Sequence, residues 1–572
     1  MVKDYPTYEV PKINSVQDLL LRSGKLYPDK LALEDLSENP ISSVTFKQLH
    51  DYVVRFGKAL QEIGLNERDH IAVISENRVQ WALTYFTSMC FNMVIVPIDK
   101  NLNQNEILNI IHESEAKAIV FSDPFEPLMK EKRDSLINME YYINMDSKEN
   151  ADGIFSMTKI IQKQSASIER LPFVNPEEMA EIIFTSGSLG RAKGVMLTQK
   201  NIASNLMAMT SMIKIGSEDR FLSVLPLHHK YECTCGLLCP LYAGGSAHYA
   251  RSLKTVVDDL QKVKATILLG VPLLYDKMFK KIYKGIKEDR VKSKIVPPLI
   301  SLTNVFESIG WKSSKKLIFK ELHHKFGGHI RLFIAGGAAP DPKVAKGLRE
   351  LGFNFIQGYG LTETSPILAL NRLYSFKDNA AGLPLPGVQI RINNPDEHGA
   401  GEIFVKGDSV MLGYYKNQKL TEEAFENGWF KTGDVGYFDE DGFLHINGRK
   451  KNVIISKNGE NVFPEEIEDI LNRNPFVQEC MVYGEEDEKH TEIIAAQIVT
   501  DAEAFIEYSE KNKFTITPEL VDSLISEAVK ETNKELPAFK QIRKFYVRDT
   551  EFEKTTTQKI KRYLMQQTYS NN

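Results

Sequence analysis

The feature that most constrains the fold is the alternation of short apolar runs with helix-like segments along most of the chain. The runs are rich in β-branched and aromatic residues and have the length of single buried strands, about four to eight residues. They are KAIVFS (117–122), EIIFT (181–185), FLSVLP (221–226), TILLG (266–270), IRLFIAGG (330–337) and FNFIQGYG (353–360). Helix-like segments such as 200–213, 255–263 and 344–351 lie between them. This alternation predicts an α/β body with largely parallel sheets.

The chain changes character after Gly382. The stretches at 387–394, 401–407 and 428–448 carry many glycines at short spacing, which indicates a small antiparallel β unit with tight turns. Beyond Arg449 the pattern is consistent with a separate α+β domain of modest size. Because 572 residues are too many for one small core, we expect a large N-terminal domain at 1–449 and a small C-terminal domain at 450–572.

Composition and charge exclude several classes of protein. The formal net charge is −5 and the pI is about 6.2. The composition therefore gives no sign of the basic surface that is usual in nucleic-acid-binding proteins. Five cysteines are too few for a disulfide framework in so long a chain, which favours a reducing, cytoplasmic compartment. Residues 1–17 lack the apolar core of a signal peptide. Charged and amide side chains at 76–80 interrupt the apolar stretch 71–97, which predicts strand, helix and strand instead of a membrane span.

A loop rich in glycine and hydroxyl side chains follows the strand EIIFT. Its sequence, FTSGSLGRAKGVML (184–197), lets backbone N–H groups converge on an anion, while hydroxyls add donors and Lys193 adds charge. It is not a P-loop, because Gly194 stands where that motif needs Ser or Thr. The loop at 185–194 therefore predicts a phosphate site, with a flexible turn as the alternative. The residues expected to bind phosphate are Thr185, Ser186, Gly187, Ser188, Gly190 and Lys193.

Two further glycine-rich loops, IAGGAAP (334–340) and QGYGLTET (357–364), also follow strands. The carboxyl ends of strands are the usual place for a ligand in an open α/β sheet. Tyr359 offers a ring face to a purine, and Glu363 offers a carboxylate to a magnesium ion that bridges phosphates. The other nucleotide-binding residues expected in these loops are Gly336, Gly337, Ala338, Gln357, Gly358, Gly360 and Thr362.

A third cluster lies in the glycine-rich segment. In TGD (432–434), Asp434 is expected beside a tight turn, where its carboxylate can accept both hydroxyls of a ribose. Arg449 in GRKKNVI can hold the other side of that sugar or its phosphate. Each cluster alone could be an ordinary turn or a surface charge, but their occurrence together predicts a nucleotide site.

The ordered set TSGSLGRAKG, GYGLTE, TGD, GRKKN and a lysine near the C-terminus resembles the adenylate-forming superfamily of acyl-CoA synthetases, carrier-loading adenylation domains and luciferases. The resemblance extends from about residue 44 to residue 562. Within that superfamily the chain is most similar to bacterial long-chain fatty-acid–CoA ligases. The motifs that point there are PLHHKYECTCG (226–236), GVPLLYDKM (270–278), NGWFKTGDVG (427–436), GRKKNVI (448–454), NGENVFPEEIE (458–468) and KTTTQKIKR (554–562).

The resemblance implies a two-step reaction with ATP, Mg²⁺ and coenzyme A. A fatty acid carboxylate attacks the α-phosphate to give acyl-AMP and pyrophosphate, and the coenzyme A thiol then displaces AMP. Attack of one anion on another needs fixed positive charge where charge builds up. By the family pattern Lys559 supplies it at the acyl-AMP oxygens, and Mg²⁺ held by Glu363 with Thr185 supplies it at the phosphates. His229 is expected to line the carboxylate end of the acyl pocket.

The resemblance also implies that the C-terminal domain is mobile. It is expected to rotate about Lys451 between the two steps, which would remove Lys559 and present the loop around Gly459 to the pantetheine arm. Lys554 and Lys561 are the alternatives for the catalytic lysine, because Gln558 stands where the family often has a glycine.

The phosphate loop departs from the common family pattern T-S-G-T-T-G at Ser188 and Leu189. Leu189 removes one donor, which is worth on the order of 1 kcal/mol if that hydroxyl binds phosphate. The departure concerns turnover rate more than reaction class. Three alternatives stay open: transfer to an acyl carrier protein, an aryl or shorter acid, and a nucleotide-binding homologue without turnover.

Two other segments carry residues typical of a metal site or a lipid-binding surface. In HHKYECTCGLLC (228–239) the cysteine spacing matches no common zinc site, which favours a buried helix of small residues. Trp81 and Trp311 are assigned to packing. The lysine-rich segment 277–294 is typical of a solvated helix face; the alternative is peripheral contact with anionic lipid at the inner face of the membrane. Chain-length preference and oligomeric state are left open.

Overall fold

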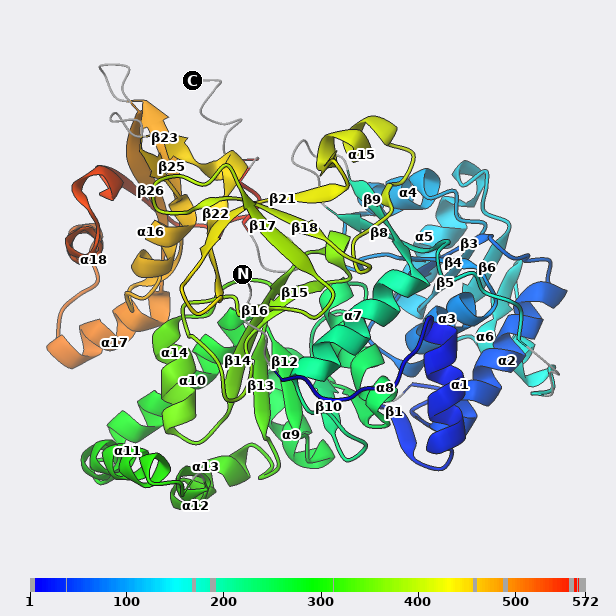
Figure 1. The fold of residues 1–572 in the computed structure, drawn as a ribbon, viewed down its shortest axis with the longest axis horizontal. Coiled ribbons are helices and arrows are strands. Elements are labelled where there is room, and N and C mark those ends of the chain that lie inside the picture. The colour runs from blue at the N-terminus through cyan, green and yellow to red at the C-terminus, as the bar shows by residue number, and fades with distance from the viewer. Residues whose placement is uncertain are drawn as a thin grey trace. The chain divides into compact units, whose positions relative to one another are not determined.

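The chain divides into two compact units in the computed structural model, which describes residues 6–37, 39–166, 171–185, 192–311, 313–455, 460–486, 492–554, 560–562 and 564. The first unit contains residues 1–389 and 405–430, and the second contains residues 390–404 and 431–572. Figure 1 shows the course of the chain. The predicted α/β fold, with a large N-terminal body and a smaller C-terminal part, is confirmed.

The first unit contains an eight-stranded sheet. Five successive strand pairs at its centre and one side are parallel, whereas β8 pairs with β9, and β9 with β19, in antiparallel fashion. In sheet order the strands are β19 (Gly413–Tyr414), β9 (Lys193–Thr198), β8 (Met179–Thr185), β4 (Val94–Pro97), β3 (His70–Ile74), β5 (Ala118–Phe121), β6 (Tyr141–Asn144) and β7 (Ile154–Ser156).

A nine-stranded sheet forms the other half of this unit. Its central pairs, from β1 through β11, β10, β12 and β13 to β14, are parallel, and the strands at both edges are antiparallel. In sheet order the strands are β16 (Leu383–Pro384), β15 (Ile367–Leu370), β14 (Phe355–Gly360), β13 (Leu332–Ala335), β12 (Ile267–Gly270), β10 (Arg220–Ser223), β11 (Ser246–Tyr249), β1 (Leu31–Asp35) and β2 (Ser43–Thr45).

Helix α3 (Val79–Cys90) contacts strands of both sheets. All twelve of its residues are buried, including Trp81 at 1% exposure, as expected for a helix that is apolar on every side. The predicted order of strand, helix and strand at 71–97 is therefore confirmed by β3, α3 and β4. Within the described part of the chain, no helix is both long and apolar enough to span a membrane.

The other helices of this unit include α7, whose N-terminus is closed by a capping box of Thr198 and Asn201. The helices are α1 (Val16–Leu26), α2 (Phe46–Glu62), α4 (Gln104–Glu113), α5 (Glu126–Glu131), α6 (Met157–Gln162), α7 (Gln199–Met212), α8 (Cys239–Ala243), α9 (Val256–Val263), α10 (Pro272–Glu288), α11 (Lys292–Ser308), α12 (Ser314–Ile318), α13 (Lys320–Lys325), α14 (Pro342–Glu350) and α15 (Gln418–Ala424).

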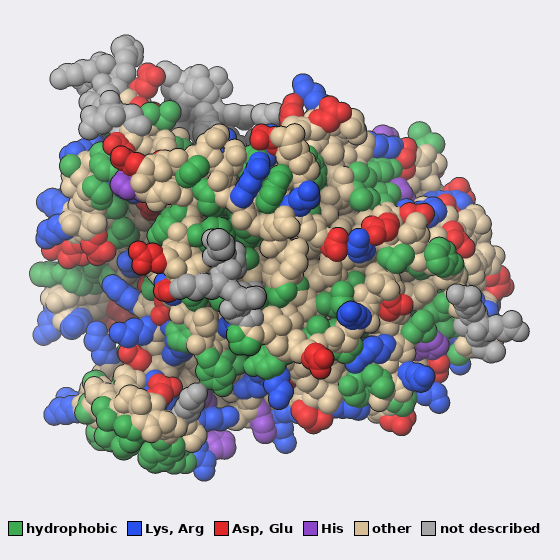
Figure 2. Space-filling model, in the orientation of Figure 1, with side chains coloured by type: hydrophobic (Ala, Val, Ile, Leu, Met, Phe, Trp, Pro, Cys, Tyr) green, Lys and Arg blue, Asp and Glu red, His purple; other side chains and the backbone are tan. Residues whose placement is uncertain are grey.

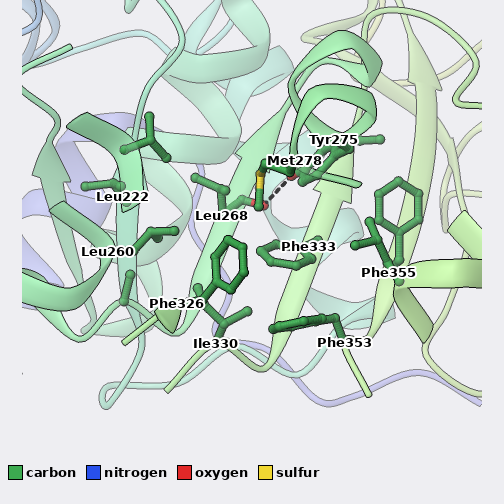
Figure 3. Packing of buried hydrophobic residues seen from close by; sticks show 14 of the residues in the cluster. Leu222, Leu260, Leu268, Tyr275, Met278, Phe326, Ile330, Phe333, Phe353 and Phe355 are labelled. Atoms are coloured by element: carbon green, nitrogen blue, oxygen red, sulfur yellow. Dashed lines mark hydrogen bonds between the residues drawn. The ribbon is translucent and has the colours of Figure 1, made fainter. Parts of the chain in front are cut away.

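An aromatic core lies on the face of the nine-stranded sheet that α9, α10 and α14 cover. Phe333 and Phe355 pack against Tyr275 of α10, and Phe353 packs against Phe333. The Tyr275 hydroxyl donates to the carbonyl oxygen of Leu268 at 2.8 Å (Figure 3). Each large side chain buried in this way stabilises the fold by about 1.5–3 kcal/mol. The core therefore fixes α10 against β12 and β13, the strands that lead to the predicted nucleotide loops.

The second unit contains most of the glycine-rich segment and the C-terminal domain. The five-stranded sheet of the glycine-rich segment contains β17 (Gln389–Asn393), β18 (Gly401–Lys406), β21 (Trp429–Phe438), β20 (Phe425–Glu426) and β22 (Leu444–Arg449), of which β20 falls within residues 405–430 of the first unit. A two-stranded ladder, β23 (Ile454–Ile455) and β24 (Asn461–Val462), follows it. The three-stranded sheet is β25 (Val477–Glu486), β26 (Glu492–Thr500) and β27 (Lys544–Arg548), and the helices are α16 (Pro464–Leu471), α17 (Ala502–Asn512) and α18 (Pro518–Glu535).

The predicted antiparallel β unit is confirmed in its central strands, since β20 with β21 and β21 with β22 are antiparallel. The C-terminal α+β domain has its own core, in which α16 and α18 pack on the three-stranded sheet. The domain boundary predicted after Arg449 stays a prediction, because compactness alone does not identify the residue about which a domain turns.

Candidate active site

The predicted phosphate loop is the connection of an antiparallel hairpin. Thr185 ends β8, Lys193 begins β9, and the two residues are direct partners across the strand pair. The remaining predicted phosphate ligands, Ser186, Gly187, Ser188 and Gly190, fall in residues 186–191, outside the described residues. A strand follows this loop, whereas a helix follows the loop of P-loop NTPases. The hairpin therefore supports the conclusion, drawn from Gly194, that this loop is not a P-loop.

Lys193 and Glu363 are joined through a tyrosine that the sequence did not single out. The Lys193 ammonium lies 5.2 Å from the centroid of the Tyr414 ring, and the Tyr414 hydroxyl donates to Glu363 Oε1 at 3.0 Å. Tyr414 is held by β19, where it pairs with Val195 of β9. The cation predicted for the phosphates thus contacts the ring of Tyr414, and the carboxylate predicted for magnesium contacts its hydroxyl.

The two other glycine-rich loops leave adjacent strands at the same edge. β13 and β14 are parallel, and Ala335 is the direct partner of Gln357. The loop that follows β13, residues 336–338, therefore lies beside the C-terminal end of β14, residues 358–360. A Cβ at Gly360 would lie 1.8 Å from the carbonyl oxygen of Pro366, so close chain approach requires glycine there. Thr362 and Glu363 lie in the one-turn helix that follows.

The side chain of Gln357, which is predicted to contact the nucleotide, forms hydrogen bonds with the protein backbone. Its side chain is 6% exposed, and its amide nitrogen donates to the carbonyl oxygens of Asp378 at 3.1 Å and Ala380 at 2.5 Å. The side chain thus fixes the loop that precedes β16. The predicted contact of Gln357 with the nucleotide stays a prediction.

His229 lies in the turn that precedes the helical segment at 232–243. Its ring centroid is 4.2 Å from that of His228, and His228 Nε2 is 3.4 Å from Asp99 Oδ1. The ligand-type atoms of these three side chains all lie within 4.8 Å of one another. His229, which is predicted to line the carboxylate end of the acyl pocket, therefore lies beside two other polar side chains.

A buried ion pair fixes the same turn. Lys230 Nζ lies 2.6 Å from Glu181 Oε2, both side chains are 1% exposed, and the Tyr85 hydroxyl donates to the same carboxylate at 3.2 Å. Because Glu181 belongs to β8, the pair connects the His229 turn with the strand that carries the phosphate loop. A charged residue inside an apolar strand was the signal in the sequence that could have identified this pair.

The cysteine-rich segment is a π-helix, Glu232–Leu238, followed by α8. Cys233, Cys235 and Cys239 are buried free thiols, as the sequence predicted for a helix of small residues. Burial raises the pKa of Cys233 to about 12, so the thiol stays protonated. Burial also raises the pKa of the fully buried Glu232 to about 8 against a smaller opposing effect of Ser223.

In the second unit, Asp434 and Arg449 form an ion pair. They are direct partners across β21 and β22, and Arg449 Nε lies 2.7 Å from Asp434 Oδ1. The prediction that Asp434 stands beside a tight turn is wrong, because the residue lies within β21; the left-handed φ of +70° at Gly433 bends that strand instead. The pairing sets one carboxylate and one guanidinium side by side. Their predicted contacts with a ribose stay a prediction.

The C-terminal lysines differ in their surroundings. Lys559, predicted to be catalytic, and Gly459 both fall outside the described residues. Lys554 is engaged by Glu479 at 2.8 Å and by Glu551 at 3.2 Å, which leaves it less suited to a ligand. Lys451, the predicted hinge, is exposed in a one-turn helix at 450–452.

Arg562 anchors the chain three residues beyond Lys559. Its guanidinium forms an ion pair with the buried carboxylate of Glu468 on α16 and donates to the carbonyl oxygen of Val482 at 2.9 Å. Burial raises the pKa of Glu468, and the charge of Arg562 partly opposes that effect. No local sequence pattern indicates a role for this arginine, since its partner is 94 residues away.

The family of the chain follows from its match to two models. Residues 20–415 match the AMP-binding enzyme family and residues 466–559 match the AMP-binding enzyme C-terminal domain. The chain belongs to the AMP-binding enzyme family. This confirms the resemblance to adenylate-forming enzymes.

Individual relatives agree with this assignment. The chain is 27% identical to the long-chain-fatty-acid–CoA ligase FadD15 of Mycobacterium bovis over 98% of the chain and 97% of the relative. It is 28% identical to the chloroplastic long-chain-fatty-acid–[acyl-carrier-protein] ligase AEE15 of Arabidopsis thaliana over 82% of the chain and 75% of the relative. Its fold is similar to that of the anthranilate CoA ligase AuaEII in complex with anthranoyl-AMP, with a TM-score of 0.78 and 21% identity over 98% of both chains.

Proposed function

We propose that the chain is an AMP-forming ligase that joins a long-chain fatty acid to coenzyme A at the expense of ATP. In the first step a carboxylate oxygen bonds to the α-phosphorus, and the bond from that phosphorus to the pyrophosphate oxygen breaks. In the second step the thiol, after losing its proton, bonds to the acyl carbon, and the bond from that carbon to AMP breaks. The substrates are a fatty acid, ATP and coenzyme A, and Mg²⁺ is the metal.

The match over almost the whole chain to the long-chain-fatty-acid–CoA ligase FadD15 carries the fatty acid assignment, and an apolar cavity supports it. The cavity is lined by Ile334 and Ala335 of β13 and Gly358 of β14, with Met209, Tyr231 and Cys235 opposite. The strands that present the loops at 336–338 and 358–363 thus also line an apolar space. A substrate whose carboxylate meets the nucleotide would place its chain there.

The cavity measures about 30 Å³, whereas ligand pockets commonly measure about 300–1,000 Å³. An acyl chain therefore requires its wall to move. The π-helix at 232–238 forms part of that wall through Cys235, and π-helical hydrogen bonding is frequent at functional sites. Small side chains on this helix, including Gly236, favour such movement.

The residues fit Mg²⁺ and a triphosphate chemically. Glu363 offers the hard carboxylate oxygen that Mg²⁺ prefers, Thr185 adds a hydroxyl, and the Tyr414 hydroxyl orients the carboxylate. Bound Mg²⁺ supplies positive charge to the phosphate oxygens. Lys193 and the loop at 185–194 hold the phosphates.

Other residues hold the remaining parts of the two substrates. Tyr359 stacks on the purine, Asp434 and Arg449 hold the ribose, and His229 meets the acid. Lys559 stabilises the charge that develops at the acyl-phosphate oxygens.

The second step uses a different wall of the same site. The C-terminal domain, taken as residues 450–572, turns about Lys451, which withdraws Lys559 and brings the loop around Gly459 to the pantetheine arm. We place the enzyme in the cytoplasm.

A carrier protein is the second candidate acceptor, since the Arabidopsis thaliana relative is named for an acyl carrier protein. An aryl acid is a second candidate substrate, since a solved structure with a similar fold is named as an anthranilate CoA ligase.

The test uses purified protein with ATP, Mg²⁺ and acids from acetate to oleate, with anthranilate as the aryl acid. Pyrophosphate and AMP release is measured with coenzyme A, with acyl carrier protein and with neither. AMP release that requires coenzyme A and is greatest with long-chain acids supports the proposal. Release with the carrier protein alone favours the second acceptor, and no release with any acid refutes the ligase function.

A further inference from the structure

Helix α11 (Lys292–Ser308) and its two capping residues, Val291 and Ile309, expose a row of large apolar side chains. Large hydrophobic residues scattered singly on a surface are ordinary, but a contiguous group marks an interaction site. We call this row the α11 ridge. Its members and their exposed fractions are Val291 (63%), Ile295 (47%), Leu302 (44%), Val305 (56%) and Ile309 (75%).

The α11 ridge is one face of the helix, and it is not the face that packs on the protein. At 3.6 residues per turn its five positions fall within about 80° of arc. Val296, Leu299 and Ile300, which pack against the aromatic core of Figure 3, are centred about 130° away by the same geometry. The helix therefore has one apolar face turned to the core and a second turned outward. Core packing does not account for the second face.

Further apolar side chains extend the ridge at its C-terminal end. Trp311 is 46% exposed, and its ring packs against Phe306 with centroids 5.1 Å apart. Leu317 of α12 is 61% exposed. Figure 2 shows hydrophobic side chains gathered over this part of the molecule, at the lower left, with cationic side chains beside them. Tryptophan at the border of such a surface is typical of a membrane interface.

The charge around the ridge is opposite in sign to that of the whole chain. Residues 277–320 contain twelve Lys and Arg against three Asp and Glu, a formal charge of +9, while the chain carries −5. The exposed cations of the described residues in this segment are Lys277, Lys280, Lys281, Lys284, Lys287, Arg290, Lys292, Lys294, Lys316 and Lys320. A cationic border around an apolar face is the combination that binds the surface of an anionic bilayer.

We propose that the α11 ridge and its cationic border form a docking surface for anionic lipid. Val305 and Ile309 lie among the acyl chains next to the headgroups, and the lysines of α10 and α11 lie at the lipid phosphates. A second copy of the chain is a poorer occupant, because two such faces would bring like charges together. A nucleic acid would meet the cations but leave the apolar ridge without a partner. The proposal does not depend on the proposed reaction, since binding can be measured without substrate.

The test is sedimentation of the full chain with vesicles of phosphatidylcholine, with and without phosphatidylglycerol at about one third. Two variants separate the contributions: Leu302→Ser/Val305→Ser/Ile309→Ser removes apolar contact, and Lys280→Glu/Lys281→Glu/Lys287→Glu reverses charge. Each should weaken binding to the anionic vesicles by about 1,000-fold, at roughly tenfold for each of its three side chains. Wild-type binding should weaken as salt rises.

The matched control is Ile137→Ser/Phe173→Ser, which removes apolar residues of 88% and 74% exposure far along the chain from α11; its vesicle binding should be unchanged. Trp311 fluorescence should shift to the blue on anionic vesicles, and the shift should disappear in Trp311→Phe. Circular dichroism must show that each variant is folded. Failure of the wild type to bind anionic vesicles at low salt overturns the proposal. Conversion of a dimer to a monomer by the apolar variant, seen by analytical ultracentrifugation, also overturns it in favour of a second copy.

Discussion

Replacement of Tyr414 by phenylalanine tests whether Glu363 binds the metal, because it removes a single hydrogen bond to that carboxylate. The hydroxyl that donates to Glu363 Oε1 at 3.0 Å is lost, while the ring that faces Lys193 at 5.2 Å is kept. The substitution therefore removes one hydrogen bond to the carboxylate and leaves the contact with the phosphate-loop lysine in place.

The magnitude follows from the charge of the acceptor. A hydrogen bond to a charged group contributes about 1.5–3 kcal/mol, and loss of a partner that orients a metal ligand costs about 10–100-fold in metal affinity. We expect Tyr414→Phe to raise the Mg²⁺ concentration for half-maximal adenylation by about 10–100-fold. The assay is pyrophosphate release at saturating ATP and acid over a series of Mg²⁺ concentrations.

Tyr415→Phe is the matched control, because the neighbouring tyrosine donates its hydroxyl to Glu115 at 3.2 Å instead. Its Mg²⁺ dependence should equal that of the wild type. An unchanged Mg²⁺ dependence in Tyr414→Phe would refute the role of Glu363 as a metal ligand oriented by this tyrosine.

Three further predictions concern the C-terminal lysine, its anchor and the buried acid of the π-helix. Lys559→Ala should abolish acyl-AMP formation yet spare thioester formation from supplied acyl-AMP, whereas Lys561→Ala should spare both; survival of both half-reactions in Lys559→Ala would contradict the assignment. Arg562→Met leaves the Glu468 carboxylate buried without this ion-pair partner and should lower the free energy of unfolding in urea by about 3–5 kcal/mol. Glu468→Gln should restore most of that loss in the double variant. A loss below about 1 kcal/mol would show that the pair is unimportant. Burial raises the pKa of Glu232 from 4.5 to about 8. The stability contributed by the protonated form is therefore fully present below pH 4.5 and is lost as the pH rises to 8, by at most about 5 kcal/mol. Glu232→Gln should remove this part of the pH dependence of urea unfolding, and identical pH profiles of the variant and the wild type would contradict the prediction.

The sheets were predictable because their strands are short apolar runs with a buried segment of three or four residues. EIIFT became β8, TILLG became β12 and FNFIQGYG became β14, because each run is shorter than a typical helix and rich in β-branched or aromatic residues. The alternation with helices then fixed the parallel pairing and placed the loops at 336–338 and 358–363 at one sheet edge.

Contacts between distant residues were not predictable. Tyr414 reaches Glu363 across 51 residues, and Arg562 reaches Glu468 across 94. Each depends on strand pairing or domain packing that leaves no local pattern. Asp434 was placed beside a turn because TGD has turn-forming composition, but cross-strand pairing with Arg449 kept the segment extended. The roles of Lys559 and of residues 186–190 stay predictions.

The most direct test of acyl-adenylate formation follows the oxygen atoms of the acid. The enzyme is incubated with a fatty acid labelled with ¹⁸O in both carboxylate oxygens, ATP, Mg²⁺ and coenzyme A, and the phosphorus products are analysed by mass spectrometry. Attack of the carboxylate on the α-phosphorus predicts one ¹⁸O in AMP and none in pyrophosphate. Label in inorganic phosphate together with ADP, or AMP without label, would contradict it.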